Sequence, residues 1–494
     1  LADYRFVLFS EAQCPCMIIA FSPEPPAKST HEFLYDAPKF NIASRRQGLV
    51  LISEGDRKSV TQARLRHAAE QGMAPITWKR LFWGTPRDQR FLNHLDTFPR
   101  LRERFADRKS GWIKGQGFIP DKRDRKGVLP RRWWEDSHLF LNAKSRRFGT
   151  DNILFEQDCE QVGHQFEVLY RSPDRELFLP PAILFNQGFT KFVYTDFPVL
   201  FRDAIQAIHA PAGEEDLLLF LLAFLQSDLA LYCCFHNSSM LGIERDVVRL
   251  EEVLDLPFPL PADAPSKQAA QIVHKVANRL RGEKATLLRL KRNMDDAAWL
   301  DVRAARTPGL KQFLDEMVCQ YFDLAESACW LIADTVNVFK PSSTPTTADK
   351  FDLPTLLPVQ EAGEVSGYTD GLQAYADALV STLNGWAEEQ NSGWRVAAQG
   401  GVDAASGLAL VSLTLVRTPE PYQDVPLTGS VWRRLFDTFA EQRVIERYER
   451  RIFGFDGDTF HVLRPMSLAN WTRTAALNDA DELFAMLQTG RRAH

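Results

Sequence analysis

The residues best suited to chemistry in this chain are lysines and arginines gathered in one stretch. From Arg100 to Arg147 the sequence holds fifteen Lys or Arg and six Asp or Glu, a net charge of +9, whereas all other residues together carry −14. Guanidinium and ammonium groups bind phosphate oxygens, and a basic face on an acidic body is typical of proteins that bind DNA or RNA. The segment therefore predicts a nucleic-acid interface, with a merely solvated basic loop as the alternative.

Aromatic side chains interleave with these cations and could stack on bases or wedge between them. The cations would set the register on the phosphates, while a smaller set of side chains would reach base edges in the major groove. Gly111, Gly115 and Gly117 are expected to bend this part of the chain. The predicted DNA-binding residues are Arg108, Lys109, Trp112, Lys114, Gln116, Lys122, Arg123, Arg125, Lys126, Arg131, Arg132, Trp133, Asn142, Lys144, Arg146 and Arg147.

Catalytic signatures are missing from the sequence. It has no G-x-x-x-x-G-K-[ST] phosphate loop, no H-E-x-x-H and no G-x-S-x-G, so no catalytic, cofactor-binding or metal-ligating residue is predicted. His236 beside Cys233 and Cys234 could be drawn as a metal cluster, but on an apolar helix we interpret it as packing. Glu283-Lys284 has a nuclease-like spacing, and we interpret it as part of a solvated helix face.

Length and composition indicate several ordinary globular domains. The 494 residues are 45% hydrophobic and 25% charged, which excludes wholesale disorder, collagen-like and coiled-coil chains. The longest apolar run, Leu217–Leu225, is far shorter than the ~20 residues of a membrane span, and no secretory signal is recognisable. Seven scattered cysteines favour reduced thiols, and we expect a cytoplasmic protein. The first residue is Leu, which suggests that a longer polypeptide extends upstream.

The hydrophobic patterns predict a mixed α/β (α+β) chain of several domains. Two short strands, over residues 4–9 and 17–21, precede a helical pattern at 59–71. Strand patterns at 176–179, 182–185 and 192–194 then indicate a β-rich module. Helices are expected at 217–235, 266–294, 310–319 and 325–339. The last third reads as a hairpin across Gly400-Gly401, between residues 393–398 and 408–416, with helices at 368–389, 428–443 and 479–489 and strands at 451–455 and 460–463.

The segment from Trp112 to Pro261 resembles the target-recognition region of adenine-specific DNA methyltransferases of type I and type IIG restriction-modification and phage-defence systems. Four motifs in this order carry the resemblance: Gly111-Trp-Ile-Lys-Gly-Gln-Gly-Phe, Leu179-Pro-Pro-Ala-Ile-Leu-Phe, Leu222-Ala-Phe-Leu-Gln-Ser-Asp-Leu-Ala-Leu-Tyr and Arg249-Leu-Glu-Glu-Val-Leu-Asp-Leu-Pro-Phe-Pro. Phe6-Val-Leu-Phe-Ser-Glu-Ala-Gln-Cys-Pro-Cys-Met-Ile-Ile-Ala-Phe is similar to the final strands of the catalytic sheet of such an enzyme.

The resemblance implies a division of the chain into four parts. Residues 1–58 would be the remnant of a methyltransferase-like catalytic domain and 59–262 the DNA target-recognition domain. Residues 263–345 would form a helical linker, and 346–494 a C-terminal α/β domain of unknown role.

The same resemblance implies that S-adenosylmethionine is the cofactor of the complete enzyme. The Gly-rich cofactor turn and the N-P-P-[YF] motif do not occur in this sequence, so the chain alone is not expected to bind that cofactor or to methylate DNA. Its expected partners are double-stranded DNA, a catalytic methyltransferase domain or subunit and other defence-system proteins, with no membrane. The alternative is a non-catalytic scaffold or adaptor of a multi-protein defence complex. A nuclease with an unrecognised site ranks below both.

Overall fold

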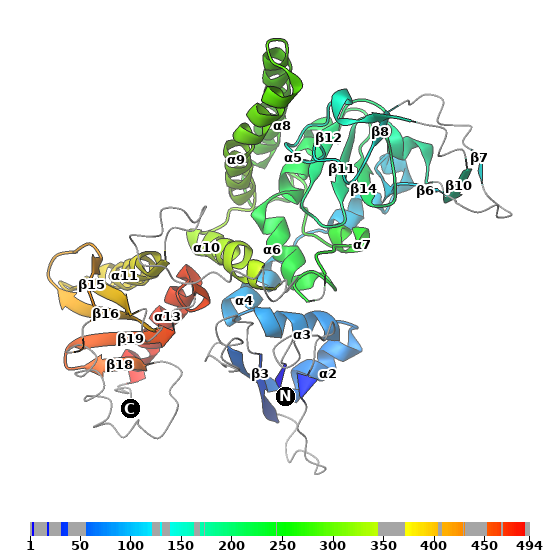
Figure 1. The fold of residues 1–494 in the computed structure, drawn as a ribbon. Coiled ribbons are helices and arrows are strands. Elements are labelled where there is room, and N and C mark those ends of the chain that lie inside the picture. The colour runs from blue at the N-terminus through cyan, green and yellow to red at the C-terminus, as the bar shows by residue number, and fades with distance from the viewer. Residues whose placement is uncertain are drawn as a thin grey trace. The chain divides into compact units, whose positions relative to one another are not determined.

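The fold is known from a computed structural model. It describes residues 2–3, 17–18, 31–37, 56–120, 129–130, 139–162, 168–171, 173–243, 245–343, 371–403, 408–427, 429, 452–465 and 468–489. Over these residues helices combine with five small β-sheets, which gives the expected mixture of α and β structure (Figure 1). The chain divides into a central unit, residues 84–332, and a terminal unit, residues 1–83 and 333–494. The expected linker is thereby divided, because residues 263–332 belong to the central unit and 333–343 to the terminal unit.

A four-stranded antiparallel sheet forms the middle of the central unit. Its strand order is β12 (Phe192–Thr195), β11 (Ala182–Asn186), β14 (Ile205–His209) and β5 (Ile113–Gln116). β11 is a continuous apolar run and is buried along almost its whole length, as expected for a strand covered on both faces. Residues 113–116, expected to be a turn, are the edge strand of this sheet.

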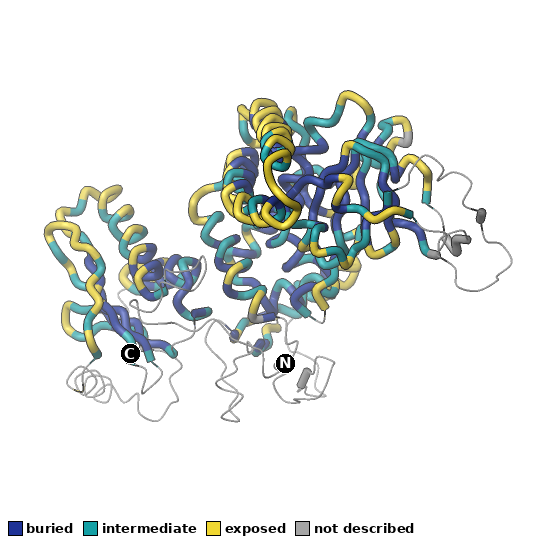
Figure 2. The backbone as a smooth tube through the Cα atoms, turned by 45° about the horizontal axis from the view of Figure 1, so that its top comes forward, coloured by how far each residue is buried: buried dark blue, intermediate teal, exposed yellow. Residues whose placement is uncertain are grey.

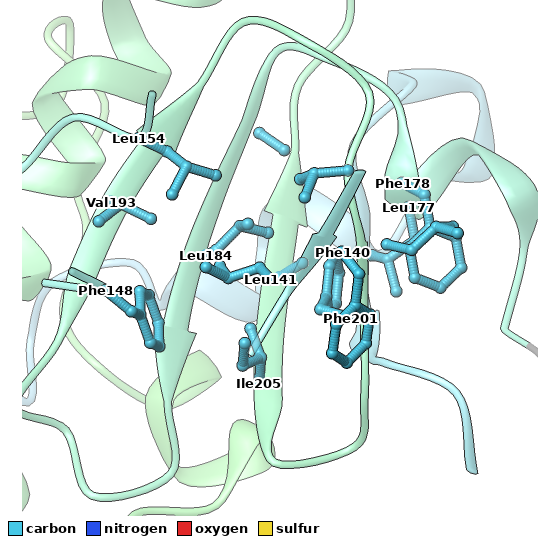
Figure 3. Close-up of a cluster of buried hydrophobic side chains, with 14 of the residues drawn as sticks. Phe140, Leu141, Phe148, Leu154, Leu177, Phe178, Leu184, Val193, Phe201 and Ile205 are labelled. Atoms are coloured by element: carbon cyan, nitrogen blue, oxygen red, sulfur yellow. The ribbon is translucent and has the colours of Figure 1, made fainter. Parts of the chain in front are cut away.

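Two smaller sheets accompany it in the central unit. One has the order β6 (Ile119–Pro120), β10 (Val168–Arg171), β7 (Leu129–Pro130), and the other β13 (Leu200–Phe201), β8 (Leu139–Leu141), β9 (Glu160–Gln161). One apolar cluster fills the space between the strands (Figure 3). The labelled side chains of this cluster are Phe140, Leu141, Phe148, Leu154, Leu177, Phe178, Leu184, Val193, Phe201 and Ile205.

Five short helices lie before, between and after these strands. They are η2 (Leu101–Phe105), η3 (Arg108–Ser110), η4 (Glu156–Asp158), η6 (Arg175–Phe178) and α7 (Leu250–Leu254). The expected strand at 176–179 is therefore wrong, because most of it forms η6, whose Leu177 and Phe178 side chains both enter the core. α4 (Pro86–Leu95) begins at Thr85, which shares a capping box with Asp88.

The helix expected at 217–235 is two helices. α5 (Glu215–Leu225) ends at Gln226, and α6 (Asp228–Asn237) starts after Ser227, whose hydroxyl accepts a hydrogen bond from the Ala230 amide at 3.2 Å. The axes differ by 62°. Among the described residues no single helix is long and apolar enough to cross a membrane, and only this bent pair reaches that length and composition when taken together.

Two long helices and a shorter one complete the central unit. α8 (Ala269–Lys291) matches the expected amphipathic helix, and its outward face is exposed (Figure 2). α9 (Asp296–Tyr321) is much longer than the expected 310–319, because it continues through Pro308. Buried side chains on both sides of the proline, Trp299 and Leu314, hold the helix in place. α10 (Glu326–Asp334) then carries the chain into the terminal unit, where a π-helical turn, η7 (Thr335–Phe339), and η8 (Pro341–Ser343) follow.

The N-terminal part of the terminal unit contains one sheet of order β2 (Met17–Ile18), β1 (Ala2–Asp3), β3 (Glu32–Asp36), β4 (Arg57–Thr61). Helices α2 (Gln62–Glu70) and α3 (Ala74–Trp83) follow it. Of the strands expected at 4–9 and 17–21, only residues 17–18 lie among the described residues.

The C-terminal part of the terminal unit is a five-stranded sheet with two helices. Its order is β17 (Gln423–Asp424), β15 (Arg395–Asp403), β16 (Leu408–Val416), β19 (Thr459–Pro465), β18 (Ile452–Asp456), and the helices are α11 (Gly371–Glu389) and α13 (Arg473–Thr489). A short helical turn, η11 (Leu468–Asn470), precedes α13. The helix expected at 428–443 lies outside the described residues apart from Gly429.

The hairpin of this sheet differs from the expected one. Gly400 and Gly401 lie inside β15 rather than in its turn. A Cβ at Gly401 would come within 2.0 Å of the Val425 carbonyl oxygen, so glycine is needed for the close approach of a neighbouring backbone.

Candidate nucleic-acid interface

The edge strand β5 lies within the basic segment and carries Lys114 and Gln116 of the predicted interface. It pairs with β14 on one side, from Ile113 opposite His209 to Gln116 opposite Gln206. A Cβ at Gly117 would lie 2.3 Å from the Phe201 carbonyl oxygen, so this glycine allows the strand to pack against the neighbouring backbone. Packing thus explains why a glycine stands at position 117.

Trp112 is the only predicted tryptophan of the site that lies within the described residues, and its ring is in the interior. The residue is 5% exposed, and its Nε1 donates to Glu214 Oε2 at 2.9 Å. Arg104 lies over the ring at 5.3 Å and also bonds Glu214, while Phe105 meets the ring edge-on at 6.2 Å. Trp112 therefore helps to close the core rather than presenting its face to solvent.

Lys114 and Gln116 are half-buried on β5. The Lys114 ammonium pairs with Glu251 at 3.0 Å and lies 5.9 Å from the centre of the Phe105 ring. Lys109 is exposed, and its ammonium forms no ion pair within the described part of the chain. Of Arg108 only the backbone position, in η3, is described.

The loop from Asn142 to Thr150 is the best-defined cationic surface of the predicted interface. Lys144 and Arg146 are exposed, and no ion pair joins either side chain to another described residue. Arg147 is half-buried, because its Nη1 donates to the Gln157 carbonyl at 2.9 Å and its Nη2 lies 3.7 Å from Asp296.

Several bonds hold this loop in one conformation. The Asn142 side chain accepts from the Lys144 amide at 3.0 Å and donates to Glu160 at 3.1 Å. The ammonium of Lys191 donates to the Ser145 carbonyl at 3.0 Å and lies 5.4 Å from the centre of the buried Phe148 ring. Lys144 and Arg146 are therefore presented from a fixed backbone, which lowers the entropy cost of binding a ligand there.

The rest of the predicted interface lies outside the described residues. These positions are Lys122, Arg123, Arg125, Lys126, Arg131, Arg132 and Trp133. They remain predictions from the sequence alone.

A buried arginine ties the segment after this loop to α9. The guanidinium of Arg303 donates twice to Asp151, at 2.8 and 3.0 Å, and twice to Asp158, at 2.8 and 2.9 Å. It is 1% exposed and packs between the rings of Phe155 and Trp299, at 4.7 and 4.6 Å from their centres. Sequence reasoning missed this cluster, because 152 residues separate Asp151 from Arg303 and no local pattern links them.

Burial shifts the pKa values of the acid and the base in this cluster in opposite directions. Burial raises the pKa of Asp151, and the hydrogen bonds from Arg303 only partly offset that rise. For Arg303 itself burial lowers the pKa, but the two carboxylates outweigh it and the guanidinium stays charged. A paired cation is what allows two carboxylates to lie in the interior.

The remaining residues with a chemical pattern in the sequence take part in packing. Glu283 does not lie on a solvated helix face as expected, because it is buried and pairs with Arg306 at 2.5 Å, while Lys284 pairs with Asp196. His236 is buried with its Nε2 3.6 Å from Asp88. No group of ligands suited to a metal ion occurs among the residues the structure describes.

A cavity of about 290 Å³ lies between β12, α5 and α8. Its charged lining is already paired: Tyr194 donates to Glu215 at 2.5 Å, Lys284 bonds Asp196, and Arg281 lies 3.4 Å from Glu215. Burial, with Glu215 nearby, raises the pKa of the Tyr194 hydroxyl, so it stays protonated. These pairs join the central sheet to α8, and we assign them no chemistry.

Comparison with known proteins gives only distant likenesses. No model of a protein family matches the chain, and no curated protein sequence does. The HsdS subunit from Thermoanaerobacter tengcongensis is similar over 53% of this chain and 56% of its own, with 12% identity and a TM-score of 0.19. A protein from work on the assembly and conformational transition of the type I R-M system is similar over 56% of this chain and 63% of its own, with 14% identity and a TM-score of 0.19. At this TM-score neither likeness carries an argument about function.

Proposed function

We propose that this chain is the DNA-recognition portion of an adenine-specific DNA methyltransferase in a restriction-modification or phage-defence system. The observation that carries the proposal is the charge distribution: a net +9 within residues 100–147 of a chain that is otherwise acidic. The loop from Asn142 to Thr150, with exposed Lys144 and Arg146 on a fixed backbone, supports it. The sequence motifs between Trp112 and Pro261 resemble those of adenine-specific DNA methyltransferases, and this resemblance is the reason that we propose this family.

Phosphate binding in this proposal falls to the exposed cations, and Trp112 takes a supporting role. Lys109, Lys144 and Arg146 present their charges to solvent, whereas Lys114 must exchange its bond to Glu251 for a phosphate. Base readout would come from side chains on the same surface. The Trp112 ring supports β5 from within the core.

The catalytic step would belong to another domain or subunit. S-adenosylmethionine is the methyl donor of the complete enzyme in this proposal, and this chain would bring the target adenine to it. The chain's own part is to hold the duplex in register while the base leaves the stack.

The decisive experiment measures affinity for a long mixed-sequence duplex across a salt series. We compare the whole chain with Lys144→Ser/Arg146→Ser and with a matched control, Lys267→Ser/Arg289→Ser, which removes two exposed cations outside residues 100–147. Each lost phosphate contact makes the negative slope of log K against log salt shallower by about 0.9. The slope of the first variant should therefore be shallower by about 1.8, and the slope of the control should not change. At about 0.15 M salt this corresponds to roughly thirtyfold weaker binding.

A second variant examines the remaining cations. Changing Lys122, Arg123, Arg125, Lys126, Arg131 and Arg132 to Ser should flatten the slope further. If the unmodified chain shows no duplex binding at physiological salt, the recognition proposal is wrong. The scaffold interpretation, in which the basic segment docks on an acidic protein, would then take its place.

A further inference from the structure

Two cysteines meet where α9 ends and α10 begins. The Sγ atoms of Cys319, in the last turn of α9, and Cys329, in the first turns of α10, lie 3.6 Å apart. The chain reverses between them through Phe322 and Asp323, where Asp323 has a φ of +48° and the Leu324 amide bonds the Cys319 carbonyl at 3.0 Å. This turn fixes the two thiols side by side.

The two thiols are attached to parts of the molecule that differ in burial. The last turn of α9 is anchored in the core, with Val318 and Tyr321 fully buried. The first turn of α10, from Glu326 to Ala328, is exposed or half-buried. Both cysteines are themselves half-buried, unlike Cys233 and Cys234, which are enclosed in the core.

We propose that Cys319 and Cys329 form a reversible disulfide that fastens the start of α10 to the end of α9. The oxidant is a small-molecule disulfide such as oxidised glutathione. The Cys329 thiolate attacks one of its sulfurs and releases one glutathione thiolate, which leaves a mixed disulfide on Cys329. Cys319 then loses its proton and attacks the Cys329 sulfur, which releases the second glutathione and forms the Cys319–Cys329 bond.

The surroundings favour Cys329 as the attacking group. The hydrogen bond with Cys319 lowers the pKa of Cys329 to about 7, whereas it raises that of Cys319, so the pair carries its charge on Cys329 near neutral pH. By contrast, burial and the carboxylates of Asp158, Glu156 and Glu160 raise the pKa of Cys159 to about 12. Cys233 and Cys234 are fully buried and serve as further internal references.

The bond would matter because α10 is the element through which the chain leaves the central unit. The division between the units falls after Ile332, three residues beyond Cys329. In the reduced chain the first turn of α10 is held by its own backbone bonds, such as that of the Cys329 amide to the Ala325 carbonyl at 3.2 Å. In the oxidised chain a covalent bond to a buried helix end restrains it as well.

The experiment incubates the reduced full chain with oxidised glutathione, blocks free thiols with iodoacetamide and analyses tryptic peptides by mass spectrometry. Both cysteines fall in one peptide, residues 312–350, because Lys340 is followed by proline. We expect the mass of this peptide to fall by two hydrogen atoms and its two cysteines to escape alkylation. The disulfide should form at least about tenfold faster than Cys159 reacts with oxidised glutathione. Hydrogen exchange at the start of α10 should slow after oxidation.

Two variants separate the disulfide from other chemistry. In Cys319→Ser the reaction should stop at the glutathione adduct on Cys329. In Cys329→Ser, Cys319 should react with oxidised glutathione at least about tenfold more slowly than Cys329 does in the unmodified chain. The proposal is overturned if both thiols of the unmodified chain remain alkylatable while Cys159 is modified. It is equally overturned if the glutathione adduct on Cys329 persists with Cys319 present.

Discussion

Replacing Arg303 by methionine should destabilise the central unit strongly and in a pH-dependent way. Methionine keeps most of the side-chain volume between Phe155 and Trp299 but removes the four hydrogen bonds to Asp151 and Asp158. Both carboxylates are at most 5% exposed, so solvent cannot replace the lost partner. The change leaves two buried acids without their cation.

The size of the effect follows from this geometry. Breaking a buried ion pair by removing one partner costs about 3–5 kcal/mol, and with Arg303 1% exposed there is no solvent screening to reduce it. That is a large part of the roughly 5–15 kcal/mol that stabilises a folded domain. For a unit of this size we expect the midpoint of thermal unfolding to fall by about 10 °C.

The pH dependence provides the more specific measurement. Burial already raises the pKa of Asp151, and without Arg303 the rise becomes larger. A carboxyl with a raised pKa binds its proton more tightly in the folded chain than in the unfolded one. Its folded state therefore loses stability as pH rises through that pKa and regains it as pH falls. The cost of Arg303→Met should be largest near neutral pH and smaller in mild acid.

The assay is urea unfolding followed by tryptophan fluorescence, repeated from about pH 5 to pH 8. Arg292→Met, at an exposed arginine after the end of α8, is the control and should change the unfolding free energy by no more than about 0.5 kcal/mol. Adding Asp151→Asn and Asp158→Asn to Arg303→Met should recover stability at neutral pH. A cost below about 1 kcal/mol, or one that is the same at every pH, would refute this account of the cluster.

Three further substitutions probe other features of the central unit. Trp112→Phe removes the hydrogen bond to Glu214 and should cost about 1–3 kcal/mol of unfolding free energy, with duplex affinity unchanged; a large loss of affinity in the folded variant would place the ring against DNA instead. Gly117→Ala forces a methyl group against the Phe201 carbonyl and should lower the free energy of unfolding by about 1–3 kcal/mol. An unchanged midpoint of thermal unfolding would contradict the close contact. Ser227→Ala removes the cap of α6 and should cost about 1 kcal/mol, which Ser227→Thr should largely restore.

The sequence alone determined the features that depend on neighbouring residues. The charge count located the basic segment, because charge is a property of composition and needs no fold. The apolar runs located β11 and β12, and the 3.6-residue repeat located α8 and α11, since each pattern reflects burial of one surface of a regular element.

Only the tertiary structure decided which of these residues face water and where each helix begins and ends. Trp112 and Lys144 belong to the same basic segment, yet Trp112 is enclosed by Glu214 and Arg104 while Lys144 is exposed. The sequence predicted a helix only over residues 310–319, but α9 begins at Asp296 and continues through Pro308, where buried residues on both sides hold it. The ion cluster of Arg303 and the thiol pair depend on how elements pack. Such contacts join residues whose separation along the chain leaves no periodic signal, so only the folded chain reveals them.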